Sequence, residues 1–138
     1  MPEGGCFCDK IRLSYTGEPN GHALCHCLDC RKISGTSYSN NLIIPEQNFK
    51  LQSGKPKEIS KTADTGKTIT SHFCPDCGTT LFRTGDSFPG AVVLKAGVLD
   101  DPKFPGQNVP KAELFAPRRV AWVTPIDGAA QLDGMPPA

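Results

Sequence analysis

The stretch Cys25-His26-Cys27-Leu28-Asp29-Cys30 decides how the rest of the chain must fold. Its three cysteines, called the cysteine triad below, lie too close together to fill three separate core positions. Thiolates at this spacing can converge on one metal ion, and zinc is the usual ion for a sulfur-rich site. The stretch therefore predicts a metal-binding loop that the neighbouring strands must hold in place.

The remaining cysteines, called the four-cysteine cluster below, form two short pairs: Cys6 with Cys8 and Cys74 with Cys77. A structural zinc closes its shell with four protein ligands, whereas a catalytic zinc keeps three and leaves one position open. If the two pairs share one zinc, that ion joins the N-terminal strand to the middle of the chain. The triad is then the set that lacks a fourth ligand.

Three histidines could supply that ligand: His22, His26 and His72. His26 lies between two triad cysteines and should point away from the metal if Cys25 and Cys27 share one face of an extended segment. Each histidine is better explained as a structural or solvent-facing residue than as a ligand. If none binds, the open position would take water or an external thiol.

Two other uses of the cysteines compete with metal binding. Cys74-Pro75-Asp76-Cys77 could be a dithiol redox pair, but such a pair normally opens a helix, and residues 78–82 continue in a strand-like pattern. Disulfides are disfavoured because the chain has an odd number of cysteines and begins without the basic and apolar regions of a secretory signal. We therefore expect a reducing, cytoplasmic location and metal binding.

The composition limits the class of protein. The chain has 138 residues, so we expect one domain over residues 1–138, globular because 38% of its residues are hydrophobic and 21% charged. A net charge of +1 argues against a nucleic-acid partner. No apolar run approaches the roughly 20 residues that cross a bilayer, so no membrane association is expected.

Short strands should dominate, because 14 glycines and 13 prolines interrupt long helices. We expect one helical turn at 28–33, a hairpin turn at 64–66, and a tail at 124–138. Residues 91–98 form the most apolar segment and should lie at the centre of the core. The aromatic residues expected in the core are Phe49, Phe73, Phe82, Phe88 and Trp122, of which one or two could line a pocket. Alternating or apolar patterns predict strands at 11–15, 22–24, 38–44, 49–51, 57–62, 68–73, 79–83, 91–98, 114–115 and 120–123.

Several motifs together are similar to the glutathione-dependent formaldehyde-activating enzyme family, whose domain centromere protein V shares. The resemblance covers at least residues 4 to 100. The motifs are Gly4-Gly5-Cys6-Phe7-Cys8, Ile11-Arg12, Cys25-His26-Cys27-Leu28-Asp29-Cys30-Arg31-Lys32-Ile33-Ser34-Gly35 and Phe73-Cys74-Pro75-Asp76-Cys77-Gly78-Thr79-Thr80-Leu81.

The resemblance implies a mostly β, Mss4-like fold with two zinc ions. It implies a structural zinc on the four-cysteine cluster and a second zinc on the triad, where a glutathione thiol can approach. It also implies carbon–sulfur lyase activity. The chain departs from the family at Glu113-Leu114-Phe115, where family members often carry a histidine before an aromatic residue.

Residues near the triad are candidates for handling the substrate. Arg31 and Lys32 could pair with the carboxylates of glutathione, or could be a solvated basic pair. Ser34 could offer its backbone to an anion, or form a plain turn. Asp29 could act as a general acid or base, although capping the amides of its own loop is the better explanation.

We therefore expect a zinc-dependent carbon–sulfur lyase acting on a small-molecule adduct of glutathione or another thiol. The alternative is a non-catalytic zinc module with an Mss4-like fold that binds a protein partner. That alternative predicts a fourth protein ligand on the triad. A role on DNA or microtubules would need a long basic extension that this sequence lacks.

Overall fold

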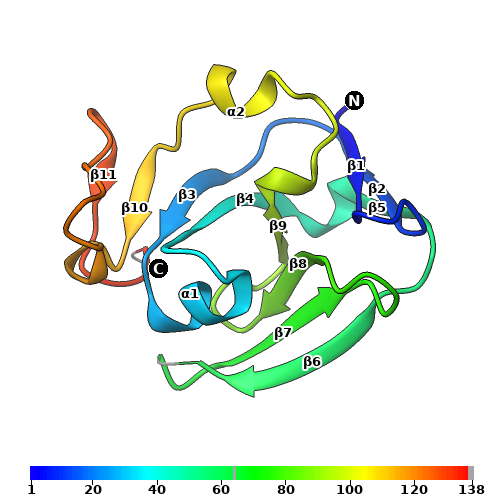
Figure 1. Cartoon of the computed structure of the whole chain (residues 1–138), viewed down its shortest axis with the longest axis horizontal. Coiled ribbons are helices and arrows are strands. Elements are labelled where there is room, and N and C mark those ends of the chain that lie inside the picture. Colours follow the sequence, from blue (N-terminus) through cyan, green and yellow to red (C-terminus); the bar gives the residue numbers. More distant parts are fainter. Residues whose placement is uncertain (64, 137–138) are drawn as a thin grey trace.

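The chain folds into two β-sheets linked by short helices and loops (Figure 1). The structure is a computed structural model that describes residues 1–63 and 65–136. The mostly β fold predicted from the sequence is confirmed, and its short, largely antiparallel strands agree with an Mss4-like architecture. None of the helices among the described residues is long and apolar enough to cross a membrane.

The smaller sheet has the strand order β1-β2-β5. The larger sheet has the order β11-β10-β3-β4-β9-β8-β7-β6. The strands are β1 (Glu3–Gly5), β2 (Arg12–Tyr15), β3 (Gly21–Cys25), β4 (Ser39–Pro45), β5 (Phe49–Ser53), β6 (Lys57–Thr62), β7 (Thr68–Phe73), β8 (Thr80–Gly85), β9 (Ala91–Lys95), β10 (Ala112–Leu114) and β11 (Ala130–Gln131). The helices are α1 (Leu28–Ser34) and α2 (Phe104–Gln107), with single 3₁₀ turns at Glu46–Asn48, Ala96–Val98 and Ala116–Arg118.

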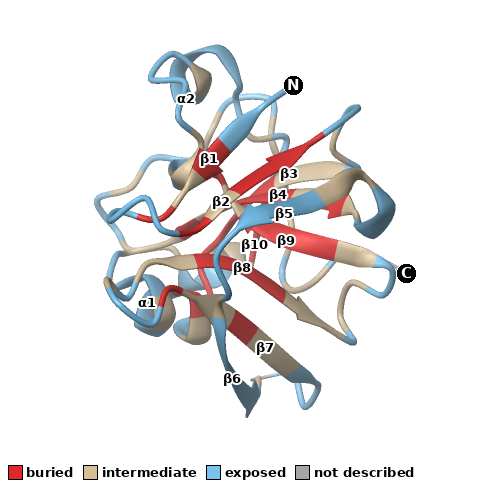
Figure 2. Cartoon of the chain, turned by 90° about the vertical axis from the view of Figure 1, so that its right-hand side faces the viewer, coloured by how far each residue is buried: buried red, intermediate tan, exposed pale blue. Residues whose placement is uncertain are grey.

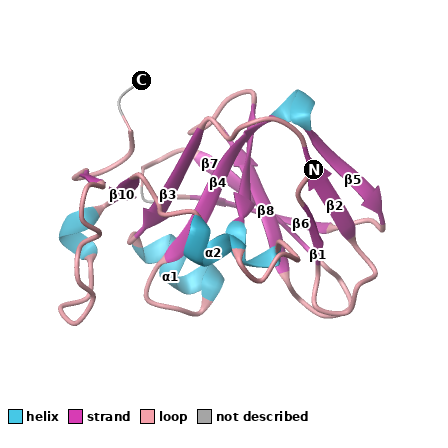
Figure 3. Cartoon of the chain, turned by 90° about the horizontal axis from the view of Figure 1, so that it is seen from above, coloured by secondary structure: helices cyan, strands magenta, loops and turns pink. Residues whose placement is uncertain are grey.

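Strands β4 and β9 are neighbours in the middle of the larger sheet. They pair antiparallel, with Leu42 opposite Leu94 and Ile43 opposite Val93. Because side chains alternate along a strand, Leu42 and Leu94 point into the main core, together with Leu13 of the smaller sheet. Figure 2 shows the buried colour running along these central strands, while β5 and β6 are largely exposed. The view from above shows the smaller sheet at one end of the larger one (Figure 3).

Two of the predicted strands need correction. The strand expected at 91–98 ends at Lys95, and Ala96–Val98 forms a 3₁₀ turn. That turn brings Leu99 to the backbone of Gly4, where an added Cβ would lie 2.1 Å from the Val98 carbonyl oxygen. The approach is possible only because Gly4 has no side chain.

The second correction concerns residues 120–123, which form a turn instead of a strand. The Val123 amide donates to the Val120 carbonyl oxygen at 3.0 Å, so this apolar run curls between Pro117 and Pro125. Trp122 is 77% exposed, so its expected place in the core is wrong. Phe82 is buried, and Phe49 packs against the same cluster.

The hairpin between β6 and β7 and the C-terminal region complete the fold. Strands β6 and β7 match their predicted bounds. Gly66 has φ +85° and donates its amide to Ala63 at 2.9 Å, whereas Asp64 of the expected turn lies outside the described residues. Within the segment expected as a tail, β11 pairs with β10, and Met135 packs against the triad. Residues 137–138 of that segment also lie outside the described residues.

The core position of Leu94 generates a stability prediction. Leu94 is 0% exposed, so Leu94→Ala should lower the free energy of unfolding by about 2–5 kcal/mol through lost burial and a residual cavity. Leu51→Ala is the matched control, because Leu51 is 39% exposed, and should cost less than about 1 kcal/mol. Denaturant unfolding measures both. Equal losses would show that β9 is not the centre of the core.

Candidate metal centres and the adjoining cavity

The four-cysteine cluster has the geometry of a tetrahedral sulfur site. Its four Sγ atoms lie within 4.8 Å of one another. The Cys6 and Cys8 sulfurs are 3.6 Å apart, and those of Cys8 and Cys74 are 3.7 Å apart. In a zinc tetrahedron with Zn–S bonds of about 2.3 Å, neighbouring sulfurs are about 3.8 Å apart. The donor set therefore fits zinc.

Backbone amides around this cluster point at the sulfurs. The Ile11 amide donates to Cys6 Sγ at 3.3 Å, and the Cys77 amide donates to Cys74 Sγ at 3.5 Å. Gly78 then leaves the turn with φ +81°, a left-handed conformation that glycine adopts without strain. Such amides stabilise thiolate over thiol. Cys74 and Cys77 lie in a turn between β7 and β8, so they lack the helix typical of a dithiol redox pair.

The triad lies where β3 runs into α1. Cys25 ends β3, Cys27 is the N-cap of α1, and Cys30 lies in the first turn of that helix. The Cys30 amide donates to Cys27 Sγ at 3.3 Å, so a thiol performs the capping that a Ser or Asp usually performs. All three side chains are buried, and their sulfurs lie within 4.8 Å of one another. All seven cysteines lie within the described residues, and each of them is a free thiol.

No histidine or carboxylate joins the triad among the described residues. His22 contacts the Asn40 amide oxygen at 2.7 Å, and His72 stacks on Phe82 and contacts Thr84 Oγ1 at 3.0 Å. His26 turns away to Glu113, as its place between two cysteines predicts. The described part of the chain therefore offers this cluster three ligands.

The charges around the triad favour thiolate character. Hydrogen bonds from Cys25 and Cys27 lower the pKa of Cys30 to about 2, and the positive charge of Lys95 acts in the same direction. The same contacts raise the pKa of Cys25. The direction of the Cys30 shift favours the thiolate, which is the form in which a cysteine binds a metal.

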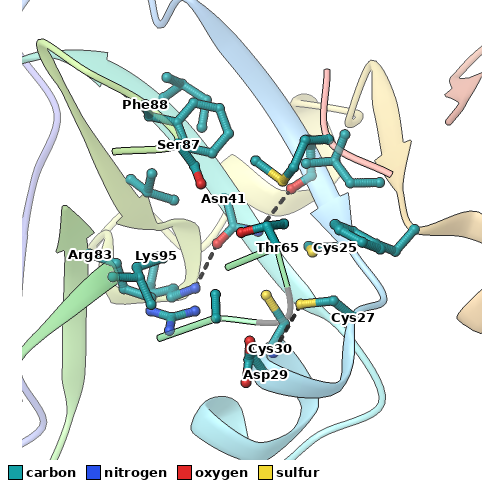
Figure 4. A pocket seen from close by; sticks show the side chains of 18 residues that line it. Cys25, Cys27, Asp29, Cys30, Asn41, Thr65, Arg83, Ser87, Phe88 and Lys95 are labelled. Carbon is teal, nitrogen blue, oxygen red and sulfur yellow. Dashed lines mark hydrogen bonds between the residues drawn. The ribbon is translucent and has the colours of Figure 1, made fainter. Parts of the chain in front are cut away.

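A cavity of about 70 Å³ opens directly beside the triad (Figure 4). Apolar side chains form much of its wall, including Ile43, Val93 and Phe88. Asp29 also lines it, with its carboxylate 3.4 Å from the Lys61 ammonium group. The open side of the triad therefore faces a small, mostly apolar space.

The cavity also contains two cations that sequence reasoning missed. Arg83 of β8 and Lys95 of β9 line it from neighbouring strands, with their charged ends toward the centre in Figure 4. A sequence signal existed, because Lys95 falls within the segment expected to be the most apolar strand. Lysine is almost never fully buried unless it is paired, so a lysine in such a strand indicates a polar partner.

The basic residues predicted from the sequence lie elsewhere. Arg31, Lys32 and Ser34 are exposed on α1, and none lines the cavity beside the triad. The Ser34 hydroxyl donates to the Cys30 carbonyl oxygen at 2.5 Å, so it holds the end of the helix. Their contact with a substrate stays a prediction, as does an acid–base role for Asp29.

A buried contact between His26 and Glu113 holds the triad loop against the C-terminal region. His26 Nε2 lies 2.8 Å from Glu113 Oε1, and both side chains are 0% exposed. Burial opposes the charge of Glu113, but the Gln131 side chain and the Ile126 amide donate to it at 2.7 and 2.9 Å. These bonds prevail and lower the pKa of Glu113 to about 2. Glu113, at which the sequence departs from the family motif, therefore has a defined structural role in this network.

Fold and site together define a mostly β protein with one cluster of four cysteines and one of three, each of which could hold a metal ion. The sequence profile of the family described as glutathione-dependent formaldehyde-activating enzyme matches residues 1–118, so the chain belongs to that family. Its description ties the family to glutathione. A solved Rhodobacter sphaeroides protein has the same fold, with a TM-score of 0.60 and 18% identity over 78% of this chain and 97% of that one.

The Glu113 network generates a pH prediction. The pKa of Glu113 lies below its ordinary value, so the charge stabilises the fold fully above about pH 4.5, and this contribution fades as pH falls toward 2. Glu113→Gln should therefore lower the free energy of unfolding at pH 7 by on the order of 2 kcal/mol. The difference between wild type and variant should shrink in acid.

Denaturant unfolding across this pH range measures the difference, and effects common to both proteins cancel. Glu46→Gln, at an exposed position, is the control and should change stability little at any pH. A Glu113→Gln protein as stable as wild type at pH 7 would contradict the network.

Proposed function

We propose that the chain is a zinc-dependent carbon–sulfur lyase that acts on an adduct of glutathione or another thiol. The observation that carries this proposal is the contrast between the two clusters. Four cysteines, two from the loop between β1 and β2 and two from the loop between β7 and β8, could supply all four ligands of a zinc ion. The three buried cysteines of the triad face a cavity and gain no further ligand from the described residues. A metal site with three protein ligands and an adjoining cavity is the pattern of a catalytic centre.

Cys25, Cys27 and Cys30 would hold the second zinc. When bound, zinc supplies a Lewis acid that favours the thiolate form of a coordinated sulfur. In the proposed reaction the carbon–sulfur bond breaks and the sulfur leaves with the electron pair. The carbon half loses a proton from a hydroxyl group or a neighbouring carbon and forms a C=O or C=C bond, and the proton passes to solvent or to the departing sulfur. The apolar wall at Ile43, Val93 and Phe88 would exclude water from that bond.

The molecule has room for the rest of a glutathione-sized thiol. A groove of about 510 Å³ adjoins the cavity and shares Phe88, Phe115 and Met135 with it. Lys67 also lines this groove. A thiol adduct would place its sulfur in the cavity and its longer arm in the groove. We also propose a cytoplasmic location, in which the thiols of the chain would stay reduced.

The proposal predicts two zinc ions per chain of unequal lability. The four-cysteine zinc should resist chelators, because it is fully ligated, whereas the triad zinc should leave first. Elemental analysis before and after brief chelation measures the loss, with thiol titration to count the cysteines released. One tight zinc beside three free thiols would contradict the proposal.

A pair of matched cysteine variants separates catalysis from structure. Cys27→Ser should abolish turnover of thiol adducts such as S-hydroxymethylglutathione and leave the fold intact, because it removes one ligand of the open site. Cys74→Ser should unfold the region around β7 and β8, because Cys74 is 1% exposed within the main core. Steady-state assays and circular dichroism report the two effects.

The interaction module remains the competing explanation for these variants. It is supported if Cys27→Ser loses its fold as completely as Cys74→Ser, and if no thiol adduct is turned over by the fully metallated wild type. The triad would then be structural.

A further inference from the structure

The register of the larger sheet gathers polar residues on one face. Arg83 lies opposite Val93, and Lys95 lies two residues further along β9, on the same face. The next strands place Ser71 opposite Arg83 and Asn41 opposite Lys95. Two cations therefore share the cavity with the triad.

The partners of both cations are neutral. Arg83 Nε donates to Ser71 Oγ at 3.0 Å, and Lys95 Nζ donates to Asn41 Oδ1 at 2.7 Å. The Asn41 amide group is itself fixed, because its nitrogen donates to Ser39 Oγ at 2.9 Å. Within residues 1–63 and 65–136, neither cation forms an ion pair.

Two neighbouring buried cations without an anion are unfavourable. Arg83 is 6% exposed, and burial lowers the pKa of Lys95, with the negative charge of Cys30 opposing this shift and the Arg83 charge adding to it. Removing charges from water costs several kcal/mol per ion unless a counter-charge is present. A divalent ion on three thiolates leaves one net negative charge, which balances one of the two cations. The Asp29 carboxylate of the same cavity pairs with Lys61, so a negatively charged ligand would balance the second cation.

The shape of Arg83 indicates what that ligand carries. Its Nε is engaged by Ser71, so its two terminal nitrogens remain as a planar fork directed at the cavity. Two parallel N–H donors of this kind match the two oxygens of a carboxylate, whereas a single sulfur atom offers no such pair of acceptors. The cavity holds only about 70 Å³, so this carboxylate must lie within a few bonds of the sulfur.

We propose that Arg83 and Lys95 form a carboxylate subsite beside the triad, so that the carbon half of the substrate carries a carboxylate close to the sulfur-bearing carbon. This inference rests on the proposed lyase function. It narrows the substrate class to thiol adducts of small carboxylic acids, such as those of oxo acids or unsaturated acids. Neutral adducts would leave one cation unpaired.

Matched small thiols test the subsite directly. Mercaptoacetate and 3-mercaptopropanoate are compared with 2-mercaptoethanol and 3-mercaptopropanol by calorimetry on the zinc-loaded protein. At least one acid should bind about tenfold or more tightly than its alcohol, as expected for charged hydrogen bonds. Arg83→Gln and Lys95→Gln should each remove most of that preference and retain affinity for the alcohols.

Further variants keep the test decisive. Arg83→Lys retains the charge without the fork and should reduce the preference even if Arg83→Gln fails to fold. Lys50→Gln and Arg118→Gln, at exposed positions outside the cavity, are the charge-matched controls and should leave the preference unchanged. Equal binding of acids and alcohols by the wild type would overturn the subsite. Equal weakening of both by the variants would show that the cations only balance a thiolate.

Two more measurements separate this inference from the proposed function. Cobalt(II) in place of zinc reports sulfur binding through its absorption spectrum. A spectral change without a preference for carboxylates overturns the subsite but agrees with the proposed function. A preference for carboxylates without a spectral change agrees with an anion site at Arg83 and Lys95 but contradicts the proposed function. If Arg83→Gln and Lys95→Gln weaken the binding of glutathione by the same factor as the binding of mercaptoacetate, the subsite binds a carboxylate of the thiol half. The assignment to the carbon half is then wrong.

Discussion

The alternation of side chains along β4 and β9 is the constraint on which the rest of the structure depends. Leu42 and Leu94 fill the main core on one face, and Asn41 and Lys95 line the cavity on the other. A slip of one residue in this register would bury the lysine in the core and expose the leucine. The same pairing therefore sets both the stability of the fold and the polarity of the site.

The two cysteine clusters differ because of the elements that hold them. The four-cysteine cluster joins segments far apart in the sequence, so Cys6 and Cys74 meet only when the fold is complete. The triad comes from one continuous segment, and its support comes from outside, through the contact between His26 and Glu113. Local spacing gives the triad its shape, and the buried contact between His26 and Glu113 fixes its place beside the cavity.

Cysteine spacing was enough to predict the triad, because its three cysteines lie within six residues and meet through local geometry alone. The joining of Cys6 and Cys8 with Cys74 and Cys77 followed from counting the remaining cysteines and from the family resemblance. The strands at 57–62 and 68–73 were equally predictable, since their hairpin has a clear turn signal at Gly66. Trp122 was misplaced because an apolar run between prolines resembles a strand. Arg83 and Lys95 were missed because a periodic pattern gives the face of each strand but not which strands become neighbours.

The central claim is that the triad holds a metal with one position open to an external thiol. A crystal structure of the zinc-loaded protein with glutathione tests it most directly. The account predicts a glutathione sulfur about 2.3 Å from a metal held by Cys25, Cys27 and Cys30. A fourth protein ligand in that position, with glutathione absent or bound elsewhere, would contradict it.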